Sequence, residues 1–426
     1  MYVDADEARR TAEEIDRRVR AGEDPGPFAG VPMLIKDLED VAGMPTARGS
    51  VVLKDHVAHE DCTHVARLRE AGAVLIGKSS TSEFGFVSYI NTKLHGITRN
   101  PWDLAKTPAA SSGGSAAAVA GGLVPIGSAT DGGGSIRLPA AFCGLVGMKG
   151  SFGRIPRGPR AKNGQLTTLK GCVSRSVRDA ARWYDAAAGY DARDPFSLPR
   201  IEGWEANLGK RSLKGLRVAV APNLGNAVVH PEVERVVREA AEAFVEEAAL
   251  TQVDIDVCIP ENGLAWATTG LVSLVDDLEG YWPDCKDDLT FEIRWAMEQA
   301  PNYRAWHGAA VERFRVEMNE AMADLFEQVD IVLCATSPME PFAAEGPMPR
   351  HVGEVEVSPY NAAALTIPGS ISGYPAISIP AGLSPNGLPV GLQAYARRHD
   401  DALLLDLALA VERARPWPLV APNAPV

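Results

Sequence analysis

Short, mostly apolar runs alternate with amphipathic segments along most of this 426-residue chain. Apolar runs bounded by turn residues predict buried strands at 31–35, 73–77, 216–221, 331–334, 376–380 and 390–394, and we also expect a strand at 253–257. Apolar residues at helical spacing predict helices at 4–20, 61–71, 176–188, 231–249 and 400–413. Strands and helices that follow one another in this way are typical of an α/β fold. We therefore expect a large mixed, mostly parallel central sheet covered by helices on both faces.

The stretch 259–328 departs from this alternation because its pattern is helical nearly throughout. No sharp change in composition separates it from the rest of the chain, and we find no internal repeat. We therefore expect one domain over residues 1–426, with a helical insertion or cap at about 259–328.

Composition and charge restrict the classes of function. The chain is 46% hydrophobic with a net charge of −13, which argues against a nucleic-acid surface and against binding to an anionic membrane. Six cysteines without a CxxC pair indicate reduced thiols, so we expect a cytoplasmic protein. We expect neither a signal peptide nor a membrane span, because no apolar run approaches the required length.

Two clusters of glycine and serine stand out, at 109–115 and 131–137. Glycine at this density suits a site where backbone amides point at an anion, and Ser135 closes the second cluster where a nucleophile beside its oxyanion hole would lie. A flexible linker is the alternative. The residues between the clusters disfavour it, because 116–119 reads as a packed helix and 123–126 as a strand.

Several familiar catalytic motifs are absent from the sequence. It contains no GxSxG, no GxxxxGK[ST] and no HExxH. The cluster of His56, His59 and His64 is loose, and we interpret these histidines as surface residues rather than metal ligands. We therefore expect no cofactor and no metal. No histidine lies within 107–150, so a nucleophilic serine there would need another base.

A buried lysine can serve as that base, because burial disfavours its ammonium form. Lys36 and Lys78 each follow an apolar strand, and spacing alone does not choose between them. Lys36 could instead reach solvent or pair with Asp37.

The motifs around these residues resemble those of the amidase signature family. The similarity is carried by Ser111-Ser112-Gly113-Gly114-Ser115, by Asp131-Gly132-Gly133-Gly134-Ser135-Ile136-Arg137 and by the segment from Gly30 to Asp37. It continues at 77–78, 98–102, 147–149, 373–376 and 387–393, and it is weakest between about 190 and 330.

This resemblance implies a Ser-Ser-Lys triad. Ser135 would be the nucleophile, Ser111 the bridging serine after a cis peptide bond to Ala110, and Lys36 the base. The backbone amides of Gly132, Gly133, Gly134 and Ser135 would form the oxyanion hole. Asp131, Arg137 and Ser112 would hold the loop from behind, although Asp131 and Arg137 could also form a purely structural ion pair.

Two departures from the family pattern fall in these motifs. Ala109-Ala110 replaces the usual Gly-Gly or Gly-Ala, and both residues are small enough to keep the turn. Gly132 replaces a frequent Thr or Ile, which predicts open space beside the oxyanion hole. The substrate pocket is expected from 83–95, 152–170, the helical insertion and 336–374.

The resemblance implies a serine hydrolase that cleaves C–N bonds of small amides through an acyl-enzyme. Carbamates, anilides and esters fall within the same chemistry, and we expect a monomer or homodimer. One alternative is the amidase subunit of a glutamyl-tRNA amidotransferase, although Gly132 and Leu138 depart from its usual residues. Another is a non-catalytic scaffold, which the complete set of triad residues disfavours.

Overall fold

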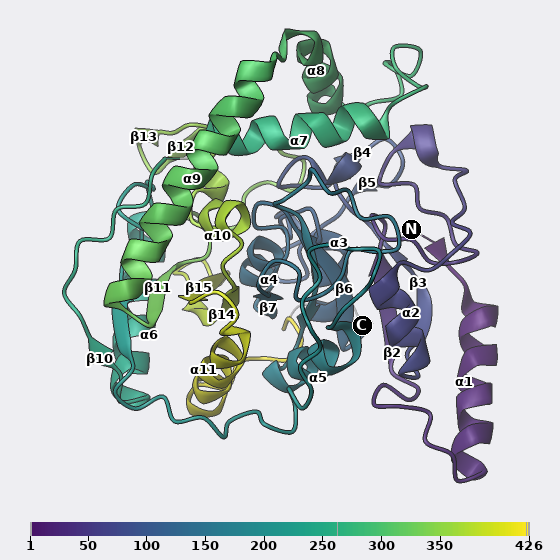
Figure 1. The fold of residues 1–426 in the computed structure, drawn as a ribbon, viewed down its shortest axis with the longest axis horizontal. Helices are drawn as coiled ribbons and strands as arrows, with labels where there is room; N and C mark the ends of the chain where they lie inside the picture. The colour runs from purple at the N-terminus through teal and green to yellow at the C-terminus, as the bar shows by residue number, and fades with distance from the viewer. Residues whose placement is uncertain (1, 262, 423, 425–426) are drawn as a thin grey trace.

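In a computed structural model, which describes residues 2–261, 263–422 and 424, the chain forms one large sheet flanked by helices (Figure 1). The sheet holds eleven strands in the order β1-β3-β2-β6-β8-β7-β14-β15-β11-β9-β10. Their bounds are β1 Tyr2–Val3, β2 Pro32–Lys36, β3 Val74–Ser79, β6 Ile126–Asp131, β7 Val146–Lys149, β8 Leu169–Ser174, β9 Arg217–Val220, β10 Thr251–Gln252, β11 Ile331–Ala335, β14 Ala376–Leu383 and β15 Pro389–Ala396. Two small hairpins lie outside it: β4 Asn91–Thr92 with β5 Gly96–Ile97, and β12 His351–Val352 with β13 Val355–Glu356.

The sheet is mixed, as predicted, and its parallel pairs form two groups. Strand β2 runs parallel to β3 and β6, and β9 runs parallel to β10 and β11. From β6 across β8, β7, β14 and β15 to β11 the pairing is antiparallel. The parallel share is thus smaller than the strand-helix rhythm predicts. The reason is that β7 and β8, like β14 and β15, follow one another without an intervening helix.

Helices pack against the sheet and against one another. Their bounds are α1 Ala5–Arg20, α2 Thr63–Glu70, α3 Gly113–Ala120, α4 Arg137–Cys143, α5 Val177–Ala187, α6 Pro231–Glu247, α7 Gly263–Asp277, α8 Phe291–Gln299, α9 Ala305–Gln328, α10 Ile367–Ser372 and α11 Asp401–Ala414. The short helices α3 and α4 pack together on β6 and β7, whereas α5 packs on α2 and α11. These layers place the glycine-rich segments, which flank α3 and β6, against the sheet.

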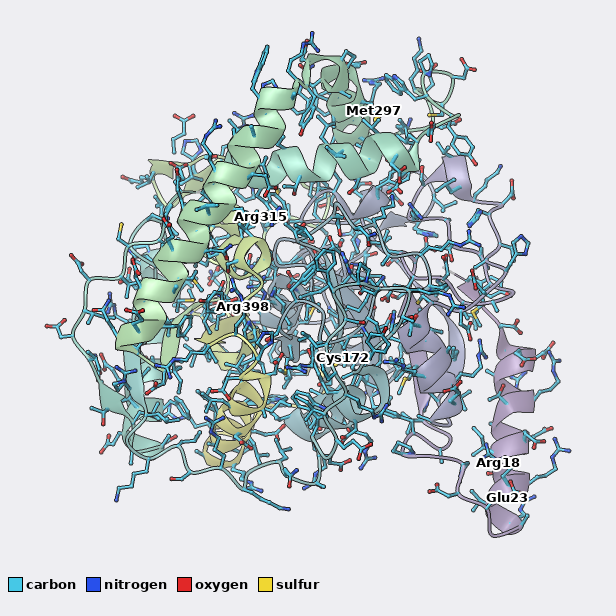
Figure 2. The ribbon with its side chains drawn as sticks, in the orientation of Figure 1. Arg18, Glu23, Cys172, Met297, Arg315 and Arg398 are labelled. Carbon is cyan, nitrogen blue, oxygen red and sulfur yellow. The ribbon has the colours of Figure 1, made fainter. Side chains whose placement is uncertain are left out.

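The helical character of 259–328 is confirmed for its described residues, which form α7, α8 and α9 at the top of Figure 1. Helices α7 and α8 and the segment between them form a small apolar core, to which Leu274, Ile293 and Met297 contribute (Figure 2 labels Met297), whereas Phe314 and Met318 of α9 belong to the main core. Phe84 and Phe86 pack against the small core from an earlier loop. That the segment is an insertion within a single domain remains a prediction.

Strand boundaries differ from the sequence prediction at two places. Leu123 was expected to begin a strand, but it is 65% exposed, and β6 begins at Ile126. The strand expected at 253–257 does not form, and the short strand β10, Thr251–Gln252, lies just before it at the edge of the sheet. Neither predicted run has a strand partner along its full length, and Asp254 and Asp256 interrupt the second run.

The thiols are free, as predicted: Cys258 is exposed and the other five are buried, among them Cys172 in the sheet (Figure 2). Within the described part of the chain, no helix has the length and apolar character needed to span a membrane.

Candidate active site

Lys36 ends β2 with its side chain completely buried. Its Nζ donates hydrogen bonds to Ser111 Oγ at 2.7 Å, Ser112 Oγ at 2.8 Å and Thr130 Oγ1 at 2.8 Å. The lysine therefore neither reaches solvent nor pairs with Asp37, whose carboxylate accepts from the backbone amides of Ala47 and Gly49 instead. The parallel register of β2 with β6 brings the lysine and Thr130 together.

The surroundings of Lys36 favour its neutral form. Burial lowers the pKa of Lys36 from its usual value near 10.5 to about 7, because the ammonium loses its hydration. Glu39 and Asp131 oppose this shift and Lys170 adds to it. A primary amine that is half deprotonated near neutral pH can accept a proton from a hydroxyl.

Lys78, the other candidate base, is bound differently. Its Nζ donates to the main-chain carbonyl of Glu39 and to Thr46 Oγ1 at 3.1 Å. A carbonyl oxygen has no proton to give, and neither Ser111 nor Ser112 is among these partners. The geometry therefore distinguishes Lys36 from Lys78, which spacing in the sequence could not do.

Ser111 and Ser112 lie at the entrance to α3, where the chain turns sharply. The peptide bond between Ala110 and Ser111 is cis, as the family resemblance implied, and Ala109 has a positive φ of 60°. Ser112 was expected to hold the loop, and it does more, because its Oγ contacts both Lys36 and the backbone of Thr130. Two serine hydroxyls, in addition to that of Thr130, therefore lie within hydrogen-bond distance of one buried amine.

Ser135 lies partly exposed at the end of the glycine-rich loop. Its carbonyl oxygen accepts a hydrogen bond from the Ser112 amide at 3.3 Å, which ties the two serine clusters together. Gly134 has a φ of 124°, a conformation that favours glycine, and its amide donates to Asp131 Oδ1 at 2.7 Å. The amide of Gly134 is therefore already bonded within the protein, and Gly132, Gly133 and Ser135 supply the remaining amides of the predicted oxyanion hole.

Asp131 and Arg137 form a buried two-point ion pair behind the loop, with Nε–Oδ2 at 2.9 Å and Nη2–Oδ1 at 3.0 Å. Burial raises the pKa of Asp131, but Arg137 outweighs it and brings the pKa down to about 2. The guanidinium also donates to four groups on β15 and at α10: the Gln393 side chain, the Tyr395 hydroxyl, the Ser370 hydroxyl and the Thr366 carbonyl. Through Asp131, the pair is also hydrogen-bonded to the amides of Gly134 and Ile136 in the loop.

Three residues outside the predicted set also hold the loop. The Trp266 indole donates to the Gly132 carbonyl at 2.7 Å, and Thr366 Oγ1 donates to the Gly133 carbonyl at 2.7 Å. Thr168 fills the space beside Gly132, because a Cβ there would lie 2.6 Å from Thr168 Oγ1. The expectation of open space at Gly132 is therefore wrong. The only signal for these residues was their position in segments predicted to shape the pocket.

The prediction that His64 is a surface residue is wrong. Its side chain is completely buried on α2, and its Nε2 lies 2.9 Å from Glu39 Oε1. Among the described residues, no group of three histidine, cysteine or acidic side chains has the arrangement of a metal site.

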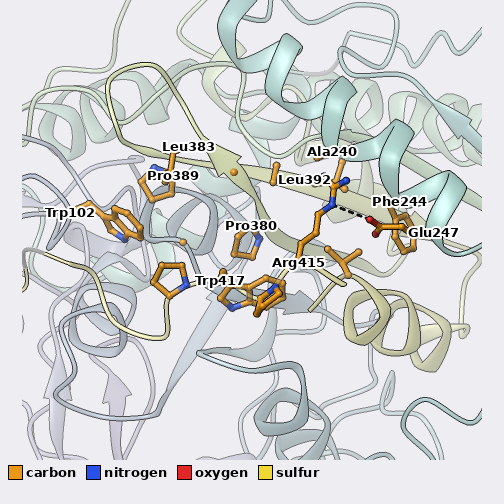
Figure 3. Close-up of a pocket in the computed structure, with 16 residues that line it drawn as sticks. Trp102, Ala240, Phe244, Glu247, Pro380, Leu383, Pro389, Leu392, Arg415 and Trp417 are labelled. Carbon is orange, nitrogen blue, oxygen red and sulfur yellow. Dashed lines mark hydrogen bonds and ion pairs between the residues drawn. The ribbon is translucent and has the colours of Figure 1, made fainter. Parts of the chain in front are cut away.

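A separate cavity of about 290 Å³ lies between α6 and the β14-β15 hairpin (Figure 3). Its wall is mainly apolar, with Trp102, Phe244 and Trp417, and the Arg415–Glu247 ion pair lies beside it. None of the predicted catalytic residues lines it, so it is distinct from the Lys36 site.

Comparisons with known proteins agree with the geometry. A family model described as Amidase matches residues 1–405. An acylamidase of Rhodococcus erythropolis is 36% identical over 98% of this chain and 88% of its own length. One glutamyl-tRNA(Gln) amidotransferase subunit, from a Psychrobacter species, is 34% identical over 96% of this chain and 87% of its own. Among solved structures, a bacterial aryl acylamidase of the amidase signature family superimposes with a TM-score of 0.94 at 29% identity, over 100% of this chain and 91% of its own.

Proposed function

The chain belongs to the amidase family, whose members include hydrolases of amide bonds, and we propose that it cleaves small amides through an acyl-enzyme on Ser135. The observation that supports this most strongly is the buried Lys36, whose Nζ is bound by Ser111 and Ser112 beside the glycine-rich loop.

In the proposed acylation step, neutral Lys36 accepts the proton of Ser111, and Ser111 accepts the proton of Ser135. The Ser135 oxygen then attacks the amide carbonyl carbon and forms a tetrahedral intermediate. Return of the proton through Ser111 to the nitrogen breaks the C–N bond, releases the amine and leaves an ester on Ser135. Water attacks this ester by the same proton route and releases the acid.

The negative charge of the tetrahedral intermediate requires donors that are already in place. We assign this role to the backbone amides of Gly132, Gly133 and Ser135. The Trp266 indole supports the assignment for Gly133, because it binds the Gly132 carbonyl, which lies in the same peptide plane as the Gly133 amide. Thr366 binds the Gly133 carbonyl and so fixes the plane that contains the Gly134 amide. The Gly134 amide would hold the loop through Asp131 rather than bind the oxyanion.

The likeness to an acylamidase and to an aryl acylamidase supports a stand-alone hydrolase with acyl amides, anilides among them, as substrates. Carbamates fall within the same chemistry. The amidotransferase subunit is a second candidate, because a relative at 34% identity carries that name. The free and mostly buried thiols are consistent with a cytoplasmic location.

The test is release of p-nitroaniline or p-nitrophenol from panels of p-nitroanilides and p-nitrophenyl carbamates by the purified chain alone. We expect turnover by the wild-type protein and a loss of about four orders of magnitude in Ser135→Ala. Full activity in Ser135→Ala would contradict the mechanism. Turnover that appears only with added partner proteins would favour the amidotransferase.

A further inference from the structure

Glu39 lies three residues after Lys36, and its carboxylate is completely buried. It accepts a hydrogen bond from the Ser128 hydroxyl and lies 2.9 Å from His64 Nε2 and 3.5 Å from Lys170 Nζ. A buried carboxylate is costly unless opposite charges and donors surround it. The two cations satisfy that requirement, but nothing in the proposed chemistry yet uses them.

Two hydrogen bonds connect this carboxylate to the backbone amide of Lys36, the proposed base. The Ser128 hydroxyl donates to Glu39, and the same oxygen accepts from the backbone amide of Lys36 at 2.7 Å. Lys78 Nζ donates to the main-chain carbonyl of Glu39 and so fixes the turn between the two residues. The carboxylate therefore holds the end of β2, from which the Lys36 side chain extends.

The same groups act on Lys36 through their charges. Glu39 and Asp131 favour its ammonium form, and Lys170 disfavours it. Lys170 lies on β8 opposite Thr130, and its side chain is 15% exposed. Asp131 forms an ion pair with Arg137. Glu39 and Lys170 are therefore the two charges behind Lys36 that we consider further.

Glu39 itself is faced from several elements. The charged or titratable groups around it are His64 and Cys62 at the start of α2, Lys170 on β8, and Lys78 on β3. Burial raises the pKa of Glu39, but His64 and Lys170 outweigh it and the pKa falls to about 2. Burial lowers the pKa of His64, but Cys62 and Glu39 outweigh it and the pKa rises to about 9.

We propose that the buried charges of Glu39, which is paired with His64, and of Lys170 bias the protonation of Lys36 from behind the active site. Glu39 is a positioning residue, because it touches neither substrate nor the proton route. The inference rests on the proposed function, in which Lys36 must be neutral to act as base.

Glu39 and Lys170 shift the protonation of Lys36 in opposite directions. Removing the negative charge of Glu39 withdraws an interaction that stabilises the Lys36 ammonium, so the base becomes neutral at a lower pH. Removing the positive charge of Lys170 has the opposite effect. A purely structural role for these residues would lower the rate without moving the pH at which activity appears.

The test measures kcat/KM for a p-nitroanilide against pH in the wild type, Glu39→Gln and Lys170→Gln. We expect the midpoint of the rise to move down by about one pH unit in Glu39→Gln and up by a smaller amount in Lys170→Gln. Gln can still accept the Ser128 hydrogen bond, so the rate at high pH should stay within about threefold of the wild type.

Equal midpoints in the wild type and both variants, or shifts in the same direction, would overturn the inference. Should Glu39→Gln fail to fold, Lys170→Gln decides alone: an upward shift supports the inference and an unchanged midpoint refutes it. Failure of the proposed function looks different. In that case the wild type would hydrolyse no amide, or its pH dependence would persist in Lys36→Met.

Discussion

Lys36 and Lys149 are two buried lysines with the same ionisation and different neighbours. Burial lowers the pKa of each to about 7, reinforced at Lys149 by the charge of Arg137. The Nζ of Lys36 is bound by three hydroxyls, whereas the Nζ of Lys149 donates to the carbonyls of Tyr374 at 2.8 Å and Gly150 at 3.4 Å. A hydroxyl can give and take a proton, but a carbonyl can only accept a hydrogen bond.

The comparison teaches that a depressed lysine pKa does not by itself identify a catalytic base. The chemical nature of the partners decides whether the neutral amine has a proton to accept. Lys78 is intermediate, because it contacts the Thr46 hydroxyl but its closer partner is the carbonyl of Glu39, and neither Ser111 nor Ser112 binds it. Variants of Lys36 and Lys149 therefore test the contrast most sharply.

The largest expected effect separates the two lysines directly. Lys36→Met should lower kcat/KM for an amide by up to about 10⁴-fold, because the Ser111 proton loses its acceptor. Lys149→Met is the matched control, since it removes a buried amine of similar pKa from β7, another strand of the same sheet. The folded fraction of that variant should keep its rate within about tenfold. Comparable losses in both variants would contradict the distinction.

The next effect concerns the two serines bound to Lys36. Ser111→Ala should lower kcat/KM by about 10²-fold or more, because the proposed relay to Ser135 is interrupted. Ser112→Ala should cost less, since its hydroxyl also binds the Thr130 backbone and acts mainly to orient the lysine. Steady-state kinetics on one p-nitroanilide will rank the two variants. The reverse order would make Ser112 the relay.

The two lysines should contribute equally to the pH dependence of the free energy of unfolding. Each pKa is lower in the folded chain than in the unfolded chain, so the unfolded state binds more protons between about pH 7 and pH 10.5, and stability rises with pH in that window. Each lysine adds up to about 1.4 kcal/mol per pH unit to the slope. Denaturant unfolding of Lys36→Met and Lys149→Met should show a similarly reduced slope. An unchanged slope in either variant would mean that its lysine is not buried as an uncharged amine.

The smallest effect tests the contact between α7 and the glycine-rich loop. Trp266→Phe keeps an aromatic ring but removes the donor to the Gly132 carbonyl. We expect kcat to fall by about fivefold, which corresponds to one neutral hydrogen bond. Trp295→Phe is a suitable control, because Trp295 is 53% exposed on α8. Equal kinetics for both variants would show that the Trp266 contact does not support catalysis.

Much of the sheet could be predicted from the sequence, because local apolar runs such as those of β2, β3 and β11 are bounded by clear turn residues. The antiparallel centre was harder to predict. Strand direction there depends on which strands meet after folding, and no local pattern records it. The strand expected at 253–257 does not form, and only the preceding Thr251 and Gln252 pair with β9.

The proposed triad residues were predicted from their resemblance to a family, and the sequence by itself left Lys36 and Lys78 as alternatives. Residues that meet the site from far along the chain could not be found locally. Trp266 contacts the loop across 134 residues of sequence. Nothing in the residues next to His64 in the sequence indicates its burial, where Glu39 and Cys62 are its partners.

The most direct test is the pH dependence of kcat/KM in Lys36→Met, Lys149→Met and the wild type, measured on one p-nitroanilide from about pH 5 to pH 10. The wild type should gain activity with a midpoint near pH 7, as Lys36 becomes neutral. Lys149→Met should keep that midpoint, and the residual activity of Lys36→Met should lack it. A midpoint that survives in Lys36→Met and disappears in Lys149→Met would contradict the assignment of Lys36 as the base.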